Sequence, residues 1–394
     1  LTGRNDWPSQ LAGPNSKSKS FFYPSVGASV VLSELMPKLN KDYLSYMKLR
    51  GSWASVGSAF GRYLANPRYE WTANSAQWSI MTQYPLYNLK PERTQSFEVG
   101  LTMRFLKNFD LDITYYNAKT MNQTFNPQLP VSGWSAMYIQ TGAVRNQGIE
   151  LSLGYKNTWN KFSWDTGFTF SMNRNKILTL ASDAINPITG ENFSIGTLNM
   201  GGLGEARFLL KEGGSMGDLY SFIDLKRDTN NKIYIDQAGK MTTETIKDPK
   251  KYIKLGSVLP KGNLAWRNNF SWNNFNAGFL VSARLGGVVF SRTQAMLDYY
   301  GVSETTAEAR DHGYVLVNGN DCVNPETWYG IIGGGTSVPQ YYTYSATNVR
   351  LQEVSLGYTF PRKMLHNICD IKISMIGRNL WMIYNKAPFD PESI

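Results

Sequence analysis

The residues of this chain that could carry out chemistry are few and scattered. His312 and His366 are the two histidines, and neither stands in a cluster of carboxylates or cysteines. Cys322 and Cys369 are too few for a disulfide framework, so we expect two free thiols, with a chance bridge as the alternative. No GxSxG, HExxH or Walker motif occurs, and GGLGEARF at 201–208 lacks the third glycine of a dinucleotide loop. The sequence therefore predicts no catalytic centre, no metal and no cofactor.

Paired carboxylates are the remaining arrangement with catalytic potential. Asp110 and Asp112 are two residues apart, so they share one face of a strand. Two such groups could act as acid and base, but they also suit a wet, charged wall. We favour the charged wall and predict that the protein is not an enzyme.

Aromatic residues in the long connections are the best candidates for contact with a ligand. Aromatic ring faces pack on the apolar C–H faces of sugars or on peptide side chains, while neighbouring amides and hydroxyls fix orientation. The same rings could instead fold the loops onto themselves or onto a neighbouring protein. The candidate substrate-binding residues are Trp71, Trp78, Trp328, Tyr329, Tyr341, Tyr342 and Tyr344.

The elements that must position these side chains are strands. In FEVGLTMRF, from Phe97 to Phe105, the odd-numbered residues are apolar and the even-numbered ones are polar or glycine, so one strand face is wholly apolar. The same alternation recurs in LDITYY, IELSLGYK, FSWDTGFTFSMN, NLAWRNNFSW, FNAGFLVSARL and VSLGYTF. No segment of comparable length has a helical period, so the predicted fold class is all-β. The twelve expected strands lie near 20–33, 43–58, 93–105, 109–121, 144–157, 161–174, 206–211, 218–227, 263–272, 275–286, 347–360 and 370–383.

Short and long connections between these strands alternate. The turns LKN, TWNK and NN are short, whereas long connections span 59–92, 122–143, 175–205, 228–262 and 287–346. This alternation is typical of an outer-membrane barrel with periplasmic turns and extracellular loops. Aromatic residues such as Phe105, Phe109 and Trp159 flank the short turns, as in the aromatic girdle of such barrels. We therefore expect the apolar strand faces to contact lipid.

Composition is compatible with that interpretation. The 394 residues are 42% hydrophobic and 18% charged, which argues against a disordered chain. The net charge of +10 is spread out, without the Lys/Arg run of a nucleic-acid-binding arm. No stretch approaches the roughly 18 apolar residues of a transmembrane helix. The mean hydropathy of −0.34 does not exclude a membrane barrel, because every second strand residue faces the lumen.

Four blocks resemble the SusC/RagA-like TonB-dependent transporters of Bacteroidota outer membranes. They are LKPERTQSFEVGLTMRFLKNFDLDITYYNAKT, GAVRNQGIELSLGYKNTWNKFSWDTGFTFSMNRNKI, LGSVLPKGNLAWRNNFSWNNFNAGFLVSARLGG and NVRLQEVSLGYTFPRKMLHNICDIKISMIGRNLWMIYNKAPFDPE. They cover about half of the chain in the family's order. One departure is RDTNNKIYID at 227–236, where Lys232 stands in place of a further oxygen ligand, so we expect a polar loop and no calcium site.

The resemblance implies an antiparallel transmembrane β-barrel, of which residues 1–394 supply the C-terminal portion. About 12 of about 22 strands would be present, numbered 10 to 21, without the plug domain, the early strands or the last strand. It also implies an importer of oligosaccharides or peptides in the cell outer membrane. The implied partners are a SusD-like surface lipoprotein, the TonB complex acting through the plug and N-terminal segment, the remainder of the barrel, and lipid, but no nucleic acid.

Two other classes of protein remain open at this point. A soluble or surface-anchored carbohydrate-binding β protein would have the same strands and loop aromatics, but it would have to bury the apolar strand faces in a core. An enzymatic outer-membrane barrel would need a nucleophile motif, and none occurs.

Overall fold

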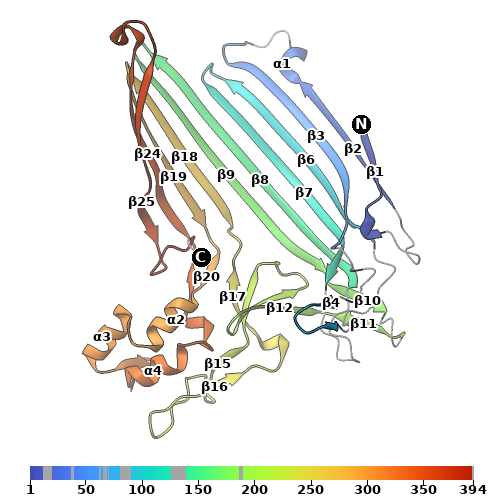
Figure 1. The fold of residues 1–394 in the computed structure, drawn as a ribbon, viewed down its shortest axis with the longest axis vertical. Helices are drawn as coiled ribbons and strands as arrows, with labels where there is room; N and C mark the ends of the chain where they lie inside the picture. The colour runs from blue at the N-terminus through green and yellow to red at the C-terminus, as the bar shows by residue number, and fades with distance from the viewer. Residues whose placement is uncertain are drawn as a thin grey trace.

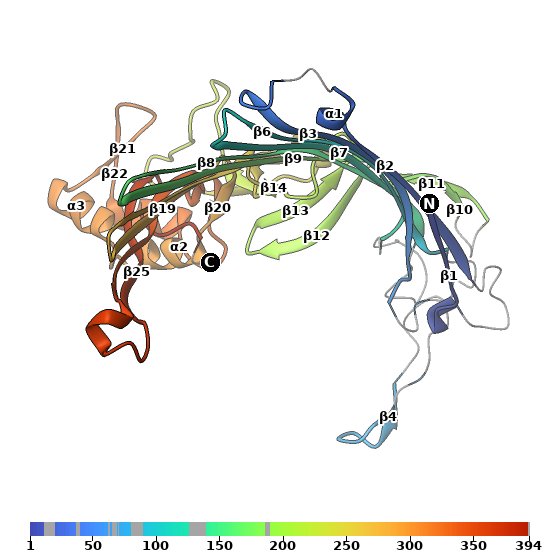
Figure 2. The same ribbon diagram turned by 90° about the horizontal axis from the view of Figure 1, so that it is seen from above.

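The structure, a computed structural model, describes residues 1–11, 20–36, 40–61, 64, 69, 71–79, 90–125, 139–185 and 190–392. Its main feature is one curved antiparallel sheet of 11 strands (Figures 1 and 2). In spatial order the strands are β1 (Thr2–Asp6), β2 (Phe21–Val31), β3 (Leu44–Ser58), β6 (Glu92–Phe105), β7 (Phe109–Phe125), β8 (Ile139–Trp159), β9 (Phe162–Thr179), β18 (Gly262–Trp272), β19 (Phe275–Leu285), β24 (Asn348–Phe360) and β25 (Ile371–Asn385). Strands of this sheet that follow one another along the chain are also neighbours in space, so the sheet is a meander.

The register of the sheet separates an apolar face from a polar one. Residues directly opposite each other on paired strands share a face. One such row runs through ten strands and is apolar throughout: Val30, Leu49, Leu101, Ile113, Leu151, Phe170, Leu264, Ala283, Val349 and Tyr384. The adjacent row is polar or glycine throughout: Ser29, Arg50, Gly100, Thr114, Glu150, Ser171, Asn263, Arg284, Asn348 and Asn385. The alternation predicted within single strands is therefore kept in register across the ten strands from β2 to β25.

The polar face is the concave one. Asn175 of β9 lies in register with Asn146 of β8, on the polar side, and its Oδ1 accepts a hydrogen bond from the Met216 amide at 2.8 Å. Met216 leads into a second sheet, of four strands, that lies inside the curve in Figure 2. That sheet is formed by β12 (Thr197–Leu203), β13 (Ala206–Lys211), β14 (Asp218–Ser221) and β17 (Ile253–Ser257).

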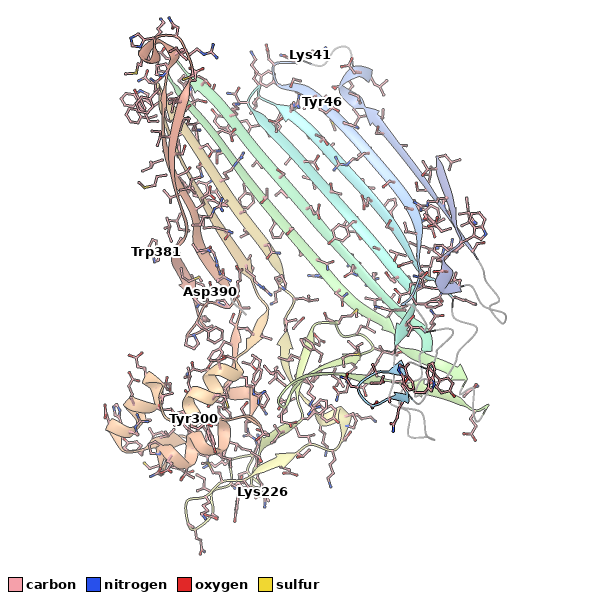
Figure 3. All side chains as sticks on the ribbon, in the orientation of Figure 1. Lys41, Tyr46, Lys226, Tyr300, Trp381 and Asp390 are labelled. Carbon is pink, nitrogen blue, oxygen red and sulfur yellow. The ribbon has the colours of Figure 1, made fainter. Side chains whose placement is uncertain are left out.

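The two ends of the large sheet differ, as the sequence predicts. Short turns join β6 to β7, β8 to β9 and β18 to β19 at one end, and the long connections leave from the other (Figure 1). Asn160 and Asn273 occupy left-handed positions in two of these turns, with φ of 54° and 49°, which asparagine tolerates better than most residues. Figure 3 shows Lys41 and Tyr46 at the short-turn end and Lys226 and Tyr300 among the loops.

The strand count differs from the expected twelve. Ten of the predicted strands lie in the large sheet, together with β1, which was not predicted. The predicted strands at 206–211 and 218–227 are not part of the wall. The first is β13, and the second divides into β14 and β15 (Ile223–Leu225), so both belong to the long connection between β9 and β18. β13, β14 and β15 pair with strands of that connection, while β9 pairs with β18 in the wall.

The connection between β19 and β24 contains helices, which the sequence did not predict. They are α2 (Arg292–Tyr299), α3 (Glu304–His312) and α4 (Pro325–Ile332). Each is short, and each begins at a capping residue, Ser291, Ser303 or Asn324. They surround a buried cluster to which the β9–β18 connection contributes Leu225 and Met241. Its other members lie between β19 and β24: Ala295, Val317, Val323, Trp328, Ile332, Val338 and Tyr342.

The remaining elements are small. Strand pairs form between β4 (Trp71–Thr72) and β5 (Gln77–Trp78), β10 (Ala181–Ile185) and β11 (Asn192–Ile195), β15 and β16 (Thr243–Thr245), β20 (Val288–Phe290) and β23 (Thr343–Ser345), and β21 (Val315–Val317) and β22 (Asp321–Val323). Short helices are η1 (Ser9–Leu11), α1 (Leu32–Leu35), η2 (Pro249–Lys251), η3 (Pro339–Tyr341) and η4 (Arg362–Leu365). Among the described residues, no helix is long and apolar enough to cross a membrane.

Candidate functional site

The polar wall is held together by charge pairs that cross strands. Arg50 of β3 reaches over β6 to Asp112 of β7, with Nη1 to Oδ2 at 3.0 Å and Nη2 to Oδ1 at 2.8 Å. The hydroxyls of Thr102 and Thr114 accept from the same guanidinium at 2.8 and 2.6 Å and donate to the Asp112 carboxylate. This bidentate geometry is the strong form of an arginine–carboxylate contact. The four residues thereby join three neighbouring strands.

Gly100 makes this network possible. It lies between Arg50 and Thr114 in the register, beneath the bridging arginine. A Cβ at this position would come within 2.5 Å of the Arg50 guanidinium carbon. The absence of a side chain therefore lets Arg50 lie flat on the β6 backbone.

The two carboxylates considered as an acid–base pair have different partners. Asp110 accepts from Arg104 Nε at 3.0 Å, whereas Asp112 is bound by Arg50. A further pair on the polar wall joins Arg267 Nη2 to Asp165 Oδ1 at 3.2 Å. Each of these carboxylates has a guanidinium neighbour, which supports the charged-wall interpretation.

The opposite, convex face is apolar and unprotected by other parts of the described chain. Val30, Leu49 and Ile113 in its central row are 37%, 41% and 36% exposed. Towards the short turns this face carries a belt of aromatic rings, each of which contacts at least one other ring, with centroid separations from 4.7 to 6.5 Å. Its members are Phe105, Phe109, Tyr155, Trp159, Phe162, Trp164, Phe270, Phe275, Phe279 and Tyr358. The clustering predicted at the short turns is confirmed, and it extends from β6 to β24.

Trp71 and Trp78 form an exposed aromatic pair in the connection between β3 and β6. They are cross-strand partners in the β4–β5 hairpin, with ring centroids 5.5 Å apart and an edge-to-face arrangement. Both side chains are more than half exposed, at 53% and 66%. Their rings are therefore open to a ligand or a partner.

The aromatic candidates between β19 and β24 are more enclosed. Trp328 and Tyr342 belong to the buried cluster, and Tyr341 packs edge-to-face against Trp328 with centroids 5.3 Å apart. Burial, followed by the negative charge of Asp298, raises the pKa of Tyr344 to about 12 and also raises that of Tyr342. In this structure these rings pack inside the connection and stabilise its fold.

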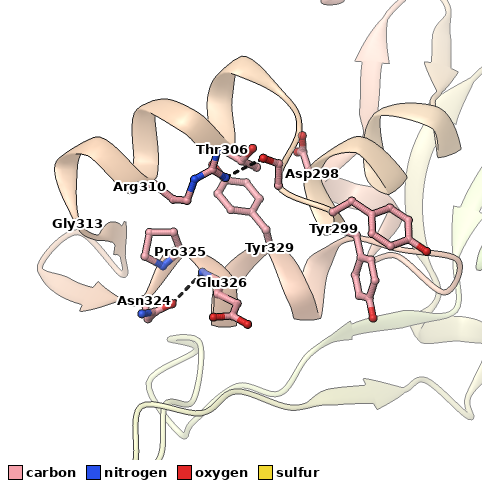
Figure 4. Close-up of a pocket in the computed structure, with 11 residues that line it drawn as sticks. Asp298, Tyr299, Thr306, Arg310, Gly313, Asn324, Pro325, Glu326 and Tyr329 are labelled. Atoms are coloured by element: carbon pink, nitrogen blue, oxygen red, sulfur yellow. Dashed lines mark hydrogen bonds between the residues drawn. The ribbon is translucent and has the colours of Figure 1, made fainter.

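Tyr329 differs because it faces a hollow. The hollow has a volume of about 470 Å³ and lies between α2, α3 and α4 (Figure 4). Tyr329 and Arg310 face it, and Arg310 Nη1 donates to the Gly301 carbonyl at 2.8 Å. The exposed rings of Tyr299 and Tyr300 complete one side. Of the five candidate aromatic residues in this connection, Tyr329 lines this hollow and the other four do not.

The polar loop at 227–236 has the expected turn character. Asp228 Oδ1 accepts from the amides of Asn230 and Lys232, both at 2.9 Å. The same turn recurs at Asp236, whose Oδ1 accepts from Ala238 and Lys240. Within the part of the chain that the structure describes, no group of three or more His, Cys, Asp or Glu could hold a metal ion.

One cluster was missed from the sequence. Arg350 of β24 is nearly buried and bonds Asp390 through both terminal nitrogens, at 3.2 and 2.7 Å, and Glu392 at 3.1 Å. Phe389 packs edge-to-face on Tyr344 with centroids 5.5 Å apart. The segment after β25 is thus bound to β24 and to the helical connection, which is the segment 286–347 between β19 and β24. The signal was present in the FDPE sequence, which the family resemblance included without a structural role.

A curved meander with one polar and one apolar face, an aromatic belt and unequal ends defines a barrel wall of the outer-membrane type. The family described as "TonB dependent receptor-like, beta-barrel" matches residues 1–320, and the chain belongs to that family. The resemblance inferred from the four sequence blocks is confirmed at this level.

Individual relatives agree with this assignment. The chain is 24% identical to TonB-dependent receptor P3 of Formosa agariphila over 80% of its own length and 32% of the relative's. It is also 24% identical to the TonB-dependent receptor SusC of Bacteroides thetaiotaomicron, over 86% of its length and 34% of the relative's. Among solved structures, that of the RagAB peptide transporter matches with a TM-score of 0.75 at 18% identity, covering 99% of this chain and 43% of that one. The chain therefore spans about a third of these curated relatives.

Proposed function

We propose that this chain forms part of the wall and the surface loops of an outer-membrane importer energised by TonB. One observation carries the proposal: adjacent residue rows across ten strands are wholly apolar on the convex face and polar on the concave face. A soluble β protein would bury the apolar row, whereas a barrel in a bilayer exposes it to lipid. The family membership supports the same location.

Closure of the barrel requires further strands. The 11-stranded sheet is open at β1 and β25, and unpaired backbone groups are not viable in hydrocarbon. If the complete barrel has about 22 strands with both termini periplasmic, odd-numbered strands run outward. β1 and β25 both run towards the long loops, which fits strands 11 and 21 of such a barrel. This numbering replaces 10 to 21 and keeps the predicted strand directions.

We infer that the substrate is an oligosaccharide or a peptide. Relatives include a protein named SusC and a complex described as a peptide transporter, and the chain spans less than half of each. By the same resemblance, a SusD-like lipoprotein would cover the loop end and TonB would act through a plug in the lumen. Growth of a deletion strain on single oligosaccharides or peptides would separate the two substrate classes.

The loop aromatics enter this proposal with different roles. Trp71 and Trp78 offer exposed rings that could contact substrate or the lipoprotein. Tyr329, Tyr341 and Tyr344 are partly buried, and of these Tyr329 lines the hollow between α2, α3 and α4 with part of its ring. Trp328 and Tyr342 would reach a ligand only if the buried cluster opened, so we assign them to loop stability.

The alternative of a soluble carbohydrate-binding protein is less well supported. Such a protein would have to bury the convex face in a core, and no part of the described chain covers that face. An enzymatic role gains no support from the wall carboxylates, which are paired with arginines.

Two adjacent residues of β9 test the assignment of faces. Phe170 lies in the apolar row and Ser171 in the polar row. In a bilayer, Phe170→Arg should destabilise the barrel by about 2–4 kcal/mol near the midplane, whereas Ser171→Arg, beside Glu150, should cost much less. Urea unfolding of the barrel reconstituted in lipid measures the difference. Equal losses for the two variants would remove the membrane assignment.

A further inference from the structure

Basic residues gather on the convex face of the wall, between its apolar rows and the long loops. Lys119 of β7, Arg145 of β8 and Lys176 of β9 lie directly opposite one another in register, and we call these three residues the basic row. Lys119 is six positions from Ile113 and Arg145 is six positions from Leu151, both of the apolar row. Because strand side chains alternate between faces, the basic row shares the convex face with these apolar residues.

The neighbouring rows on this face add positive charge and no negative charge. Arg174 lies in the row that starts at Phe97 of β6, and Arg93 starts the row on the other side. In these three rows, five of the twelve positions on β6 to β9 are Lys or Arg, and none is Asp or Glu. Like charges that face each other on adjacent strands destabilise a sheet, so this arrangement favours a site that receives an anion.

The basic row has no acidic partner within the part of the chain that the structure describes. On the concave face, by contrast, Arg50 and Arg267 are each bound by an aspartate. Lys119 and Lys176 are exposed, and Arg145 is half-buried with an Nε that has no hydrogen-bond partner among the described residues. The positive charge of this surface is therefore available to a group outside the described chain.

The basic row lies about one membrane thickness from the aromatic belt at the short turns. Lys119 is ten residues from Phe109 on β7, and Arg145 is ten residues from Tyr155 on β8. At about 3.3 Å per residue and a strand tilt of about 40°, ten residues rise about 25 Å along the membrane normal. The apolar band of an outer-membrane barrel has the same height, about 25 Å. The basic row is therefore at the level of the lipid headgroups on the loop side.

Exposed aromatic rings mark the same edge of the apolar band. Trp53, Phe97 and Tyr115 are exposed on the convex face, in the two rows that precede the basic row. Aromatic rings are enriched at both membrane–water interfaces of such barrels. Lys and Arg at this level keep their aliphatic stems against apolar surface and extend their charged ends towards the headgroups.

We propose that the basic row binds the phosphate groups of lipids in the outer leaflet of the outer membrane. The proposal rests on the proposed function, because it requires the convex face to lie in a bilayer with the long loops outside. The Arg145 guanidinium can bind a phosphate through two nitrogens, and the two lysine ammonium groups add point charges on either side of it. A phosphate in this position would also relieve the repulsion between the three cations.

Lipid retention by the full-length protein tests the proposal. The protein is placed in phosphatidylcholine nanodiscs that contain either lipid A, which carries phosphate groups, or dephosphorylated lipid A. Native mass spectrometry then measures the lipid that stays bound. The unchanged protein should retain lipid A several-fold more than the dephosphorylated form. The combined variant Lys119→Gln, Arg145→Gln and Lys176→Gln should lose this preference, because it keeps polar side chains and removes the charge.

A matched control removes the same charge from the other face. Lys48, Lys156 and Lys372 lie on the concave face, in register with Thr102, Asp165 and Thr359. The combined variant Lys48→Gln, Lys156→Gln and Lys372→Gln should keep the preference for lipid A. Loss of the preference in this control would show an effect of net charge alone and would contradict the site.

The outcomes separate this proposal from the proposed function. If the unchanged protein gives a heat-modifiable folded band in nanodiscs but retains both lipids equally, the basic row does not bind phosphate and the barrel assignment stands. If it gives no folded band in any nanodisc, the proposed function itself fails. Lys119→Glu with Lys176→Glu replaces the triple variant if that variant does not fold, and it should also lose the preference. Since both lysines are exposed, failure of this second variant to fold would contradict their place on the lipid-facing surface.

Discussion

At the scale of single residues, the Arg50–Asp112 network shows how side chains on the polar face connect neighbouring strands. The two residues are 62 positions apart, so their pairing follows from strand register and could not be predicted from the sequence. Their side chains are 38% and 40% exposed, so the ion pair alone contributes modestly. The shared threonine hydroxyls and the space above Gly100 give the network its fixed geometry.

Substitution of Gly100 should disturb this network in a way that depends on Arg50. Gly100→Ala should lower the free energy of unfolding by about 1–3 kcal/mol, because the new methyl group occupies the place of the guanidinium. In an Arg50→Ala background the same substitution should cost little, since the space is free. Urea unfolding of the four variants gives the coupling energy. Additive losses would show that Arg50 does not lie over Gly100.

Tyr344 makes the folding of the helical connection sensitive to alkaline pH. Its pKa is raised to about 12, so the folded connection favours the neutral phenol. The corresponding stabilisation is fully present below the unfolded value near 10 and is lost as pH rises from 10 towards 12. Hydrogen exchange in residues 286–347 should therefore accelerate over that range. Tyr344→Phe should move the acceleration to higher pH, and an unchanged profile would contradict the role of this phenol.

At the scale of elements, the alternation of apolar and polar residues predicted ten of the eleven strands of the large sheet, but it did not predict which strands pair with each other. Ten strands were found because each alternates apolar and polar residues over most of its length. β1 was missed because TGRND has no apolar residue. The segments at 206–211 and 218–227 are strands, as predicted, but strand propensity does not specify a partner, and they pair outside the wall.

The helices were missed because each has only eight or nine residues, too few to show a clear period. Their start signals were nevertheless present. Ser291, Ser303 and Asn324 all accept a hydrogen bond from an amide in the first turn, and Asn324 is followed by Pro325. The burial of Trp328 and Tyr342 could not be foreseen, because it depends on these helices and on Leu225 from a different connection.

The cap of α4 can be tested directly. Asn324 Oδ1 accepts from the amides of Glu326 and Thr327 at 2.8 and 3.4 Å. Asn324→Ala should destabilise the helical connection by about 1 kcal/mol, which would appear as faster hydrogen exchange in α4. Asn324→Asp keeps the acceptor and should retain most of the protection. Equal exchange in the Ala and Asp variants would show that the cap contributes nothing.

At the scale of the whole molecule, the two faces of the sheet contact different environments in the proposed barrel, and the two ends of the sheet lie in different compartments. The convex face meets lipid and the concave face lines a lumen in the proposed barrel. The short turns and long loops would then lie on opposite sides of the outer membrane. The chain belongs to the TonB dependent receptor-like, beta-barrel family and spans about a third of the curated relatives it matches.

The two native cysteines provide the most direct test of this arrangement, because they lie at opposite ends of the wall. Cys322 is exposed in the helical connection at the loop end, and Cys369 is exposed in the turn before β25. In full-length protein with no other cysteine, the chain carrying Cys369→Ser should react through Cys322 with an impermeant thiol reagent on intact cells. The chain carrying Cys322→Ser should stay unlabelled until the outer membrane is permeabilised. Labelling of both thiols, or of Cys369 alone, on intact cells would contradict the barrel orientation on which the proposed function depends.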